Sequence, residues 1–290
     1  MESRRLGQQG PAVSPLGFGA MLLSIAGRPP EEQARATLSA ALDAGISFID
    51  TAGAYCLDET EYHHNERLIA STLRLRGNEA TVATKVGVRR PGGAWTVDGR
   101  PSTIRAAAIA SLEALGVQAL DLLQLHAPDS RVPFADTVGA LARLREEGKV
   151  KLIGLCNVSW QQVVAARRIV PIASVQNRWN VEDRRAEIEG MLDHCAREGI
   201  AFLAYSPFGG ARGAPVLGTH GRLAEQARRR RVSPHRLMLA WMLAKNPAVI
   251  PLVGARRPES IADSARASSL ELAAEDVAAV DDALAVKPVA

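Results

Sequence analysis

The sequence predicts a closed (β/α)8 barrel, or TIM barrel, formed by a single domain that spans residues 1–290. Short apolar runs recur eight times along the chain, and each is followed by a helix-like stretch. The runs are continuously apolar rather than alternating, which is typical of parallel strands covered by helices on both faces. No linker rich in Pro and Gly divides the chain, so eight strand–helix units are expected to close into one barrel.

The eight predicted strands are spaced so that a helix fits after each of them. Such a crossover is what a pair of parallel strands requires. The predicted strands are 15–19, 47–51, 80–86, 120–126, 150–156, 173–177, 201–206 and 248–254.

Amphipathic stretches lie between the strands and predict the outer helices. Residues 31–45 and 102–116 are examples, and both end in Gly, a helix stop signal. Ser102 is a candidate N-cap for the second stretch. Before the first strand, "RRLGQQGPAVSP" (4–15) has turn residues between short polar–apolar stretches and predicts a hairpin that closes the bottom of the barrel. The Ala-rich end, 271–290, predicts a C-terminal helical segment.

A doubly wound open sheet is the structural alternative. An open sheet that binds a dinucleotide usually has a G-x-G-x-x-G turn after its first strand. The segment "LGFGAM" (16–21) has two of these glycines and lacks the third, which disfavours this alternative.

Composition narrows the class of protein. Hydrophobic residues make up 47% and charged residues 23% of the chain, and the formal net charge is +4. This is far from the charge of a dedicated nucleic-acid binder, so no nucleic-acid partner is expected. The run of four arginines at 228–231 is interpreted as a solvated helix end. No apolar run is long enough to span a bilayer, and no signal segment begins the chain, so no membrane partner is expected.

The cysteines indicate a reducing compartment. There are three, Cys56, Cys156 and Cys195, an odd number without metal-ligand spacing. Reduced thiols in a cytoplasmic protein are therefore expected. His63 and His64 are adjacent, which is poor spacing for joint ligation of a metal, and no metal is predicted.

Four ionisable residues lie where neighbouring predicted strands end. Asp50 and His126 end the second and fourth strands, Lys85 lies at the end of the third, and Tyr55 follows Asp50 in the next loop. In (β/α)8 barrels the chemistry takes place at the carboxyl ends of the strands. Neighbouring strands are about 4.8 Å apart, so the four side chains are expected to converge. Each has a plainer interpretation as a loop cap, loop tyrosine, rim lysine or core histidine, but the set of four favours a site.

These residue types form a working set for acid catalysis. The ordinary pKa of a Tyr hydroxyl is about 10, too high for easy proton donation at neutral pH. A nearby Lys85 would lower the pKa of Tyr55, and Asp50 would hold that lysine. His126 near the same oxygen would orient a carbonyl group. The set therefore predicts general acid catalysis on a carbonyl.

The motifs that carry these residues resemble those of the aldo-keto reductase family. "DTAGAY" (50–55), "ATKV" (83–86) and "LHAPD" (125–129) occur in the family's order and spacing. The resemblance covers nearly the whole chain, and the ordered set is more specific than any single motif. The other segments that resemble the family are 4–21, 151–157, 174–177, 204–208 and 251–264.

The resemblance implies an NADPH-dependent carbonyl reductase. NADPH would lie across the top of the barrel, without a Rossmann fold, and transfer hydride to an aldehyde or ketone. Tyr55 would be the proton donor, Lys85 and Asp50 would tune it, and His126 would orient the substrate. The implied cofactor-binding residues are Asn157 and Gln176 at the carboxamide, Tyr205 on the nicotinamide ring, Ser206, Pro207 and Phe208 along the pyrophosphate, Gly254, Arg256 and Arg257 near the adenosine phosphate, and Asp263 and Ser264 near the adenine.

The residue types at these positions agree with the chemistry of such a cofactor. Amide side chains both donate and accept, as a carboxamide requires, and an aromatic face suits a planar ring. Cys156 departs from the family pattern, because many members have Ser before the carboxamide Asn. Ser264 also departs, since Asn is frequent there. Preference for NADPH over NADH therefore depends on Arg256 and Arg257, which can form charge-assisted bonds to a 2′-phosphate.

Two further residues are candidates for the substrate pocket. Cys56 follows Tyr55 directly, and Trp95 lies in a Gly-rich loop, "RPGGAWTVDGR", expected at the same rim. The expected partner is a small-molecule carbonyl compound, whose identity the sequence leaves open, and a monomer is expected.

Two other functions compete with the reductase. A cofactor-binding regulatory module with little turnover is one, although such relatives would be expected to lack part of the set of four residues. A Schiff-base aldolase centred on Lys85 is the other. It leaves Asn157, Gln176 and Tyr205 without a role.

Overall fold

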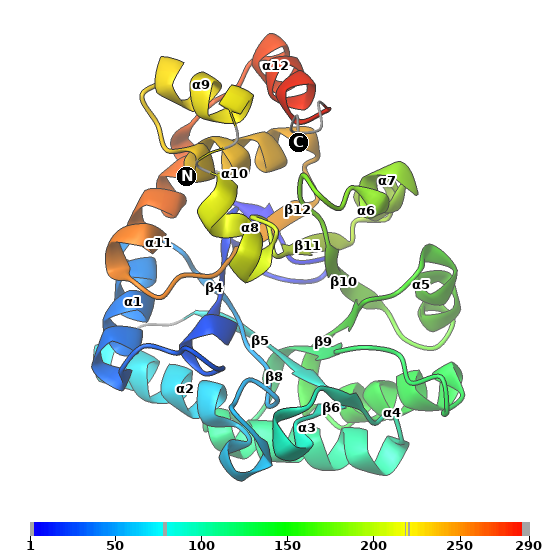
Figure 1. The fold of residues 1–290 in the computed structure, drawn as a ribbon. Coiled ribbons are helices and arrows are strands. Elements are labelled where there is room, and N and C mark those ends of the chain that lie inside the picture. Colours follow the sequence, from blue (N-terminus) through cyan, green and yellow to red (C-terminus); the bar gives the residue numbers. More distant parts are fainter. Residues whose placement is uncertain (1–2, 78–79, 218, 220, 286–290) are drawn as a thin grey trace.

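Eight parallel strands form the closed barrel that the sequence predicts (Figure 1). The computed structural model describes residues 3–77, 80–217, 219 and 221–285. The strands follow chain order around the barrel, and each lies close to its predicted run. They are β3 (Gly17–Gly19), β4 (Phe48–Asp50), β5 (Thr81–Val86), β8 (Leu120–Leu125), β9 (Val150–Cys156), β10 (Ile172–Arg178), β11 (Ala201–Tyr205) and β12 (Val249–Val253).

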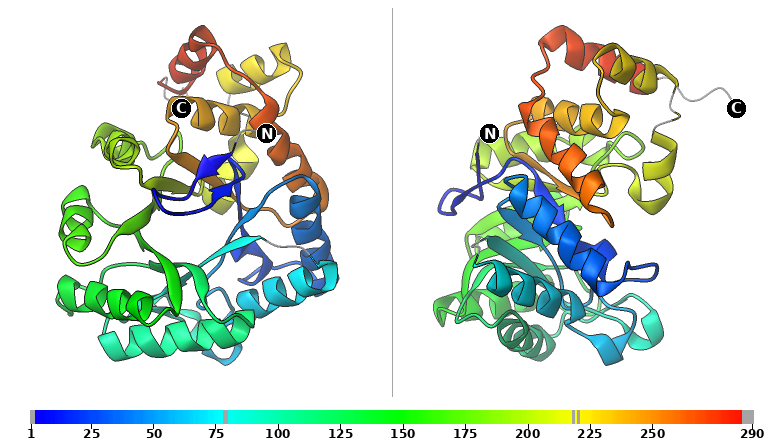
Figure 2. Two further views of the ribbon diagram at one scale, coloured as in Figure 1. Left: turned by 180° about the vertical axis from the view of Figure 1, so that it is seen from behind. Right: turned by 90° about the vertical axis from the view of Figure 1, so that its left-hand side faces the viewer.

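Helices form a ring around the strands, as the left view of Figure 2 shows. The apolar faces of strands and helices meet in one large cluster outside the barrel. The helices are α1 (Glu31–Asp43), α2 (His64–Arg76), α3 (Pro101–Leu115), α4 (Phe134–Glu146), α5 (Trp160–Arg167), α6 (Arg185–Ile188), α7 (Met191–Glu198), α8 (Gly210–Leu217), α9 (Gly221–Arg229), α10 (Pro234–Lys245), α11 (Pro258–Ala265) and α12 (Ala274–Ala285), with short 3-10 turns η1 (Ala20–Leu23), η2 (Glu59–Glu61), η3 (Pro91–Gly93) and η4 (Arg266–Ser269).

The start of α3 corrects one prediction. The helix begins at Pro101, and Arg100 is the N-cap residue without a side-chain cap. Ser102 lies within the first turn, so its prediction as the cap is wrong. Proline favours the first helical position because its fixed φ suits the helix and its missing N–H is not needed there. The predicted stop is confirmed, since Gly116 ends the helix with a φ of 69°.

A second cluster fills the inside of the barrel. Along each strand the inward side chains alternate with outward ones, as strand geometry requires. The part of the interior nearer the N-terminal ends of the strands is apolar. Its members are Leu6, Val13, Phe48, Ala83, Leu122, Ala173, Ala201, Leu203, Ile250 and Leu252.

The predicted N-terminal hairpin closes one end of this interior. Strands β1 (Arg4–Arg5) and β2 (Ala12–Val13) pair antiparallel. Leu6 and Val13 are buried in the inner cluster, so they plug the barrel at the N-terminal ends of its strands. Figure 2 shows the hairpin lying across the barrel.

Helical structure also follows the last barrel strand, as predicted. It consists of α11, η4 and α12, and the predicted residues 286–290 lie outside the described part of the chain. The arginines at 228–231 lie at the end of α9, and Arg228 and Arg229 are exposed there as expected. Within the described ranges, no helix combines the length and the apolar character that a membrane crossing demands.

One small element was not predicted. Strands β6 (Val88–Arg89) and β7 (Thr96–Val97) pair antiparallel and form a second hairpin after β5. Its tip, with η3, was expected to be an irregular loop. The pairing involves only two residues on each strand, too short for a hydrophobic period to reveal it.

Candidate active site

The barrel register places the ends of three neighbouring strands side by side. Asp50 ends β4 and pairs with Ala83 of β5, while Lys85 of β5 pairs with Gln124 of β8. His126 follows β8, and its backbone N–H donates to the Val86 carbonyl at 2.8 Å. The carboxyl ends of these strands therefore bring the predicted residues to one place.

The ammonium group of Lys85 is the centre of the site. It donates to Asp50 Oδ2 at 2.6 Å, to the Thr51 carbonyl at 2.9 Å and to Tyr55 Oη at 2.9 Å. These three bonds use all three ammonium protons. Lys85 and Asp50 are both buried, and a buried ion pair is stable only when its remaining polar atoms are also bonded.

Burial changes the expected acidity of Tyr55. Its removal from water raises the pKa of the hydroxyl, and the positive charge of Lys85 lowers it by less. The pKa of Tyr55 therefore lies above its ordinary value, so the prediction of a lowered pKa is wrong. Lys85 does lower this pKa, as predicted, but burial raises it by more. A phenolate in a dry site loses more hydration than one lysine restores.

The same environment holds Lys85 charged. Burial lowers its pKa, but Asp50 and Tyr55 raise it, and the balance lies above the ordinary value for lysine. A protonated amine has no lone pair to attack a carbonyl. A Schiff-base lysine instead needs a lowered pKa.

His126 stays neutral. Burial, helped by the charge of Lys85, lowers the pKa of His126 to about 3. Its ring centre lies 5.9 Å from that of Tyr55, edge to face. The Nδ1 atom is buried and has no partner within the described part of the chain. A neutral imidazole beside the Tyr55 hydroxyl can hydrogen-bond a carbonyl oxygen without competing for its proton.

The loop that carries Tyr55 is braced by α2. Asn65 accepts a hydrogen bond from the Thr51 hydroxyl at 2.5 Å and donates to the Ala20 carbonyl at 2.9 Å. The His63 backbone N–H donates to the Gly53 carbonyl at 2.9 Å, and a Cβ atom on Gly53 would lie 2.9 Å from the His63 ring. Sequence reasoning missed this brace. The sequence shows only an Asn in "HHNERL" on a predicted helix. Its burial, which the sequence does not reveal, is what distinguishes Asn65 from a solvated helix residue.

Trp95 lies at the mouth of the site, as predicted. It is at the end of the β6–β7 hairpin, with its ring centre 6.4 Å from that of Tyr55 and 6.3 Å from that of His126. The guanidinium of Arg90 lies over the Trp95 ring at 4.0 Å. Trp95 is 49% exposed, so its ring meets both the site and solvent. Its role as a wall of the substrate pocket stays a prediction.

Cys56 lies deeper than predicted. It is fully buried, and its thiol donates to the Ala54 carbonyl at 3.5 Å. Burial raises the pKa of the thiol to about 11, so a reactive thiolate is not favoured. Its assignment to the substrate pocket stays a prediction.

Asn157 and Tyr205 meet at the rim, next to the turn that carries His126. Asn157 follows β9 with a φ of 57°, donates to the His126 carbonyl at 2.9 Å and accepts from Tyr205 Oη at 2.8 Å. Asn157 is exposed and Tyr205 half-buried, so an amide and an aromatic ring face the top of the barrel. Such a pair could hold a carboxamide and a planar ring.

Gln176 faces inward. Its amide donates to Asp50 Oδ1 at 2.7 Å, and its side chain is buried. The structure thus connects Gln176 with the Lys85–Asp50 pair. A bond from Gln176 to the nicotinamide carboxamide stays a prediction.

The segment after β11 has an unusual backbone conformation. Ser206 has a φ of 53°, unusual for a residue other than Gly, and its carbonyl accepts from Asn180 Nδ2 at 2.9 Å. Pro207 is buried, and Phe208 packs its ring against His235 at 4.8 Å. Backbone strain of this kind is frequent at ligand sites.

The residues predicted for the adenosine end lie in the connection between β12 and α11 and on α11 itself. Arg256 follows Gly254, and its carbonyl accepts from Gln33 of α1 at 2.8 Å. Arg256 Nε is buried without a partner among the described residues, and the Arg257 side chain is 66% exposed. Arg257 Nε also lies 3.4 Å from Glu259 Oε1, so this arginine has an acidic partner. Contact of Arg256 or Arg257 with a phosphate stays a prediction.

Asp263 and Ser264 of α11 contact other parts of the protein. Asp263 is bonded to Ser233 and Arg236 of α10, and Ser264 is buried. Contact of either with an adenine stays a prediction. The described residues contain no group of three or more His, Cys, Asp or Glu side chains that could hold a metal ion.

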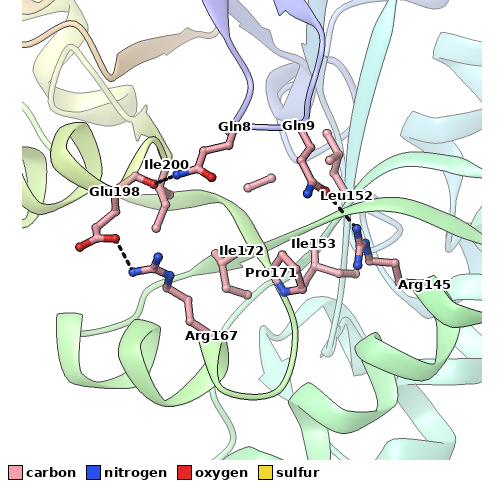
Figure 3. Close-up of a pocket in the computed structure, with 11 residues that line it drawn as sticks. Gln8, Gln9, Arg145, Leu152, Ile153, Arg167, Pro171, Ile172, Glu198 and Ile200 are labelled. Atoms are coloured by element: carbon pink, nitrogen blue, oxygen red, sulfur yellow. Dashed lines mark hydrogen bonds and ion pairs between the residues drawn. The ribbon is translucent and has the colours of Figure 1, made fainter.

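A cavity of about 230 Å³ lies at the opposite end of the barrel, between the N-terminal hairpin and the starts of β9 and β10 (Figure 3). Gln8 donates to the Glu198 carbonyl across it, and Arg167 pairs with Glu198 at 2.8 Å. None of the four catalytic candidates lines this cavity, so it is not the candidate active site.

Comparisons with known proteins agree with this geometry. The model of the aldo/keto reductase family matches residues 15–285. The chain is 31% identical to "Probable aldo-keto reductase 1" of Glycine max, over 99% of this chain and 90% of that one. It is also 31% identical to an uncharacterized oxidoreductase of Schizosaccharomyces pombe, over 93% and 86% of the two chains.

Comparison with solved structures supports the same fold. The structure of a glycerol dehydrogenase from Gluconobacter oxydans superimposes with a TM-score of 0.84 at 27% identity, covering 99% of this chain and 98% of that one. The family match covers the whole barrel, including all four catalytic candidates. The chain therefore belongs to the aldo/keto reductase family of oxidoreductases.

Proposed function

We propose that this oxidoreductase reduces an aldehyde or ketone to an alcohol with NADPH, and that Tyr55 donates the proton. One observation carries the proposal. The Lys85 ammonium group joins Asp50 Oδ2 at 2.6 Å to Tyr55 Oη at 2.9 Å, beside a neutral His126. This is the arrangement that protonation of a carbonyl oxygen requires.

The four side chains divide the work. A bound nicotinamide would supply the hydride, which adds to the carbonyl carbon. His126 orients the carbonyl oxygen towards Tyr55, and the Tyr55 O–H bond breaks as its proton passes to that oxygen. The positive charge of Lys85 stabilises the phenolate that remains, and Asp50 holds Lys85 in place. Solvent then returns a proton to Tyr55.

A raised pKa of Tyr55 is compatible with this step. It keeps the hydroxyl protonated throughout the neutral range, so Tyr55 always carries the proton that it donates. The alkoxide that develops on the substrate is a stronger base than a phenolate, so proton transfer stays favourable.

The site disfavours the Schiff-base alternative. Lys85 is charged, buried and bonded through all three of its protons. A regulatory module without turnover is disfavoured because all four candidates meet at hydrogen-bonding or ring-contact distance. Measured turnover decides between the reductase and the module.

Tyr55→Phe tests the reaction. It removes the proton donor but keeps the ring, so kcat for carbonyl reduction is expected to fall about 10²- to 10⁴-fold. Binding of NADPH, followed by quenching of tryptophan fluorescence, is expected to stay near the wild-type affinity. Tyr62→Phe is the matched control, because the Tyr62 hydroxyl bonds the Val88 carbonyl and Tyr62 lies in the same loop. Near-normal reduction by Tyr55→Phe would falsify the assignment.

Arg256→Ala tests the choice of NADPH. Loss of a charge-assisted bond to the 2′-phosphate is expected to weaken NADPH binding about 10-fold and to leave NADH binding unchanged. The control is Arg266→Ala, which removes an exposed arginine just beyond the same helix. Equal losses for both dinucleotides would show that Arg256 does not read the phosphate.

A further inference from the structure

A polar layer lies inside the barrel directly beneath the candidate active site. Gln124 of β8 is fully buried, two residues beyond the apolar Leu122 on the same inward face. Ser174 and Gln176 of β10 are buried beside it. The apolar inner cluster thus gives way to amides and a hydroxyl just before the strands end.

The Gln124 amide bonds the catalytic carboxylate. Its Nε2 donates to Asp50 Oδ1 at 3.2 Å. Its Oε1 accepts from Ser174 Oγ at 3.4 Å and lies 3.5 Å from Gln176 Nε2. This pattern fixes the orientation of the amide, because the reversed amide would turn its oxygen towards the Asp50 carboxylate.

The neighbouring strand leaves room for this arrangement. Gly154 of β9 lies between β8 and β10, and a Cβ atom there would lie 2.3 Å from Ser174 Oγ and 3.0 Å from Gln124 Cγ. Any larger residue would push the amide away from Asp50. The three strands together therefore build a socket for the Gln124 side chain.

We propose that Gln124 is a positioning residue for the reaction, which holds the Asp50 carboxylate in the rotamer that places Lys85 against Tyr55. Asp50 uses one oxygen for Lys85, and the other accepts from Gln124 and Gln176. Both oxygens are thereby anchored in a buried site, where a missing partner is costly. The inference rests on the proposed function and adds a residue outside the set of four.

Two substitutions separate positioning from simple packing. Gln124→Met keeps the volume but removes the donor, so Asp50 loses one anchor and kcat is expected to fall about 10- to 100-fold. KM and the affinity for NADPH are expected to change less than about twofold, because Gln124 is fully buried and its amide bonds protein side chains. Thr37→Val is the control, since it removes a buried hydroxyl of α1 that bonds the Gln33 carbonyl of the same helix.

Gln124→Glu gives a signature that a packing role would not produce. Two carboxyl groups this close repel each other when both are ionised, which raises the pKa of one of them. They therefore share a proton at low pH, and the new carboxyl group then donates to Asp50. The ratio of its kcat to that of the wild type is expected to fall as the pH rises and that proton is lost. A ratio that is the same at every pH overturns the proposal.

A double-mutant cycle tests the contact without cofactor or turnover. Urea midpoints are measured for Gln124→Met, Asp50→Asn and the double variant. Coupled residues give a double variant whose midpoint shift differs from the sum of the two single shifts. Additive shifts overturn the contact itself. Wild-type-like kcat in both Gln124 variants overturns the positioning role, whereas retained activity of Tyr55→Phe overturns only the assigned donor.

Discussion

At the residue scale, the site depends on charges that the barrel removes from water. Lys85 is bonded by Asp50, Tyr55 and the Thr51 carbonyl, so its charge is satisfied although it is buried. The positions of Asp50, Lys85 and His126 were predictable from strand ends, and that of Tyr55 from the loop after Asp50. Their acidities were not, because the cost of burial depends on the atoms that surround each group, and the pKa of Tyr55 is raised rather than lowered.

The neutral His126 predicts a pH dependence of stability. Its pKa of about 3 lies below the unfolded value of 6.5, so between these values the unfolded chain binds more protons than the folded one. The free energy of unfolding therefore falls as the pH drops through this range. In His126→Gln the free energy of unfolding is expected to fall less steeply with pH. The difference in slope corresponds to at most about one proton taken up on unfolding. Urea unfolding at pH 4.5 and 7.5 measures it, and an equal fall in the free energy of unfolding for both proteins would contradict a neutral His126.

At the scale of the element, the β9–α5 junction connects the site with the scaffold. Asn157 has a φ of 57°, and two residues later Ser159 caps α5. The cap is reciprocal, because the Ser159 hydroxyl accepts from the Gln162 N–H at 3.3 Å and the Gln162 side chain accepts from the Ser159 N–H at 2.9 Å. A fixed helix start restrains the turn that presents Asn157.

Ser159→Ala is expected to lower the free energy of unfolding by about 1 kcal/mol, the usual cost of a lost N-cap. Chemical denaturation measures this loss. Ser102→Ala is the matched control, because Ser102 is exposed in the first turn of α3 and does not cap that helix. An equal loss in both variants would show that the reciprocal cap contributes nothing.

At the scale of the whole molecule, the two ends of the barrel have separate tasks. The hairpin end is closed by Leu6 and Val13, and the other end carries the catalytic candidates. The apolar inner cluster lies between them. A change at the hairpin should therefore affect stability and spare the chemistry.

Leu6→Ala is expected to lower the free energy of unfolding by about 2–5 kcal/mol, because Leu6 is fully buried and the cavity cannot refill. The kcat of the folded fraction is expected to stay near that of the wild type. Leu75→Ala removes the same atoms from a side chain that is 80% exposed, and serves as the control. A large fall in kcat for Leu6→Ala would show that the two ends are coupled.

The sequence by itself determined the barrel, the hairpin, the order of the strands and the four catalytic candidates, because these depend on hydrophobic periodicity and on where each strand ends. Only the tertiary structure decided which buried groups meet. Gln124 and Gln176 bond Asp50 across 74 and 126 residues of chain, and both lie on strands whose local pattern predicts only burial. Periodicity reports which face of a strand is buried, whereas closure of the barrel decides which atoms face one another and how much water they lose.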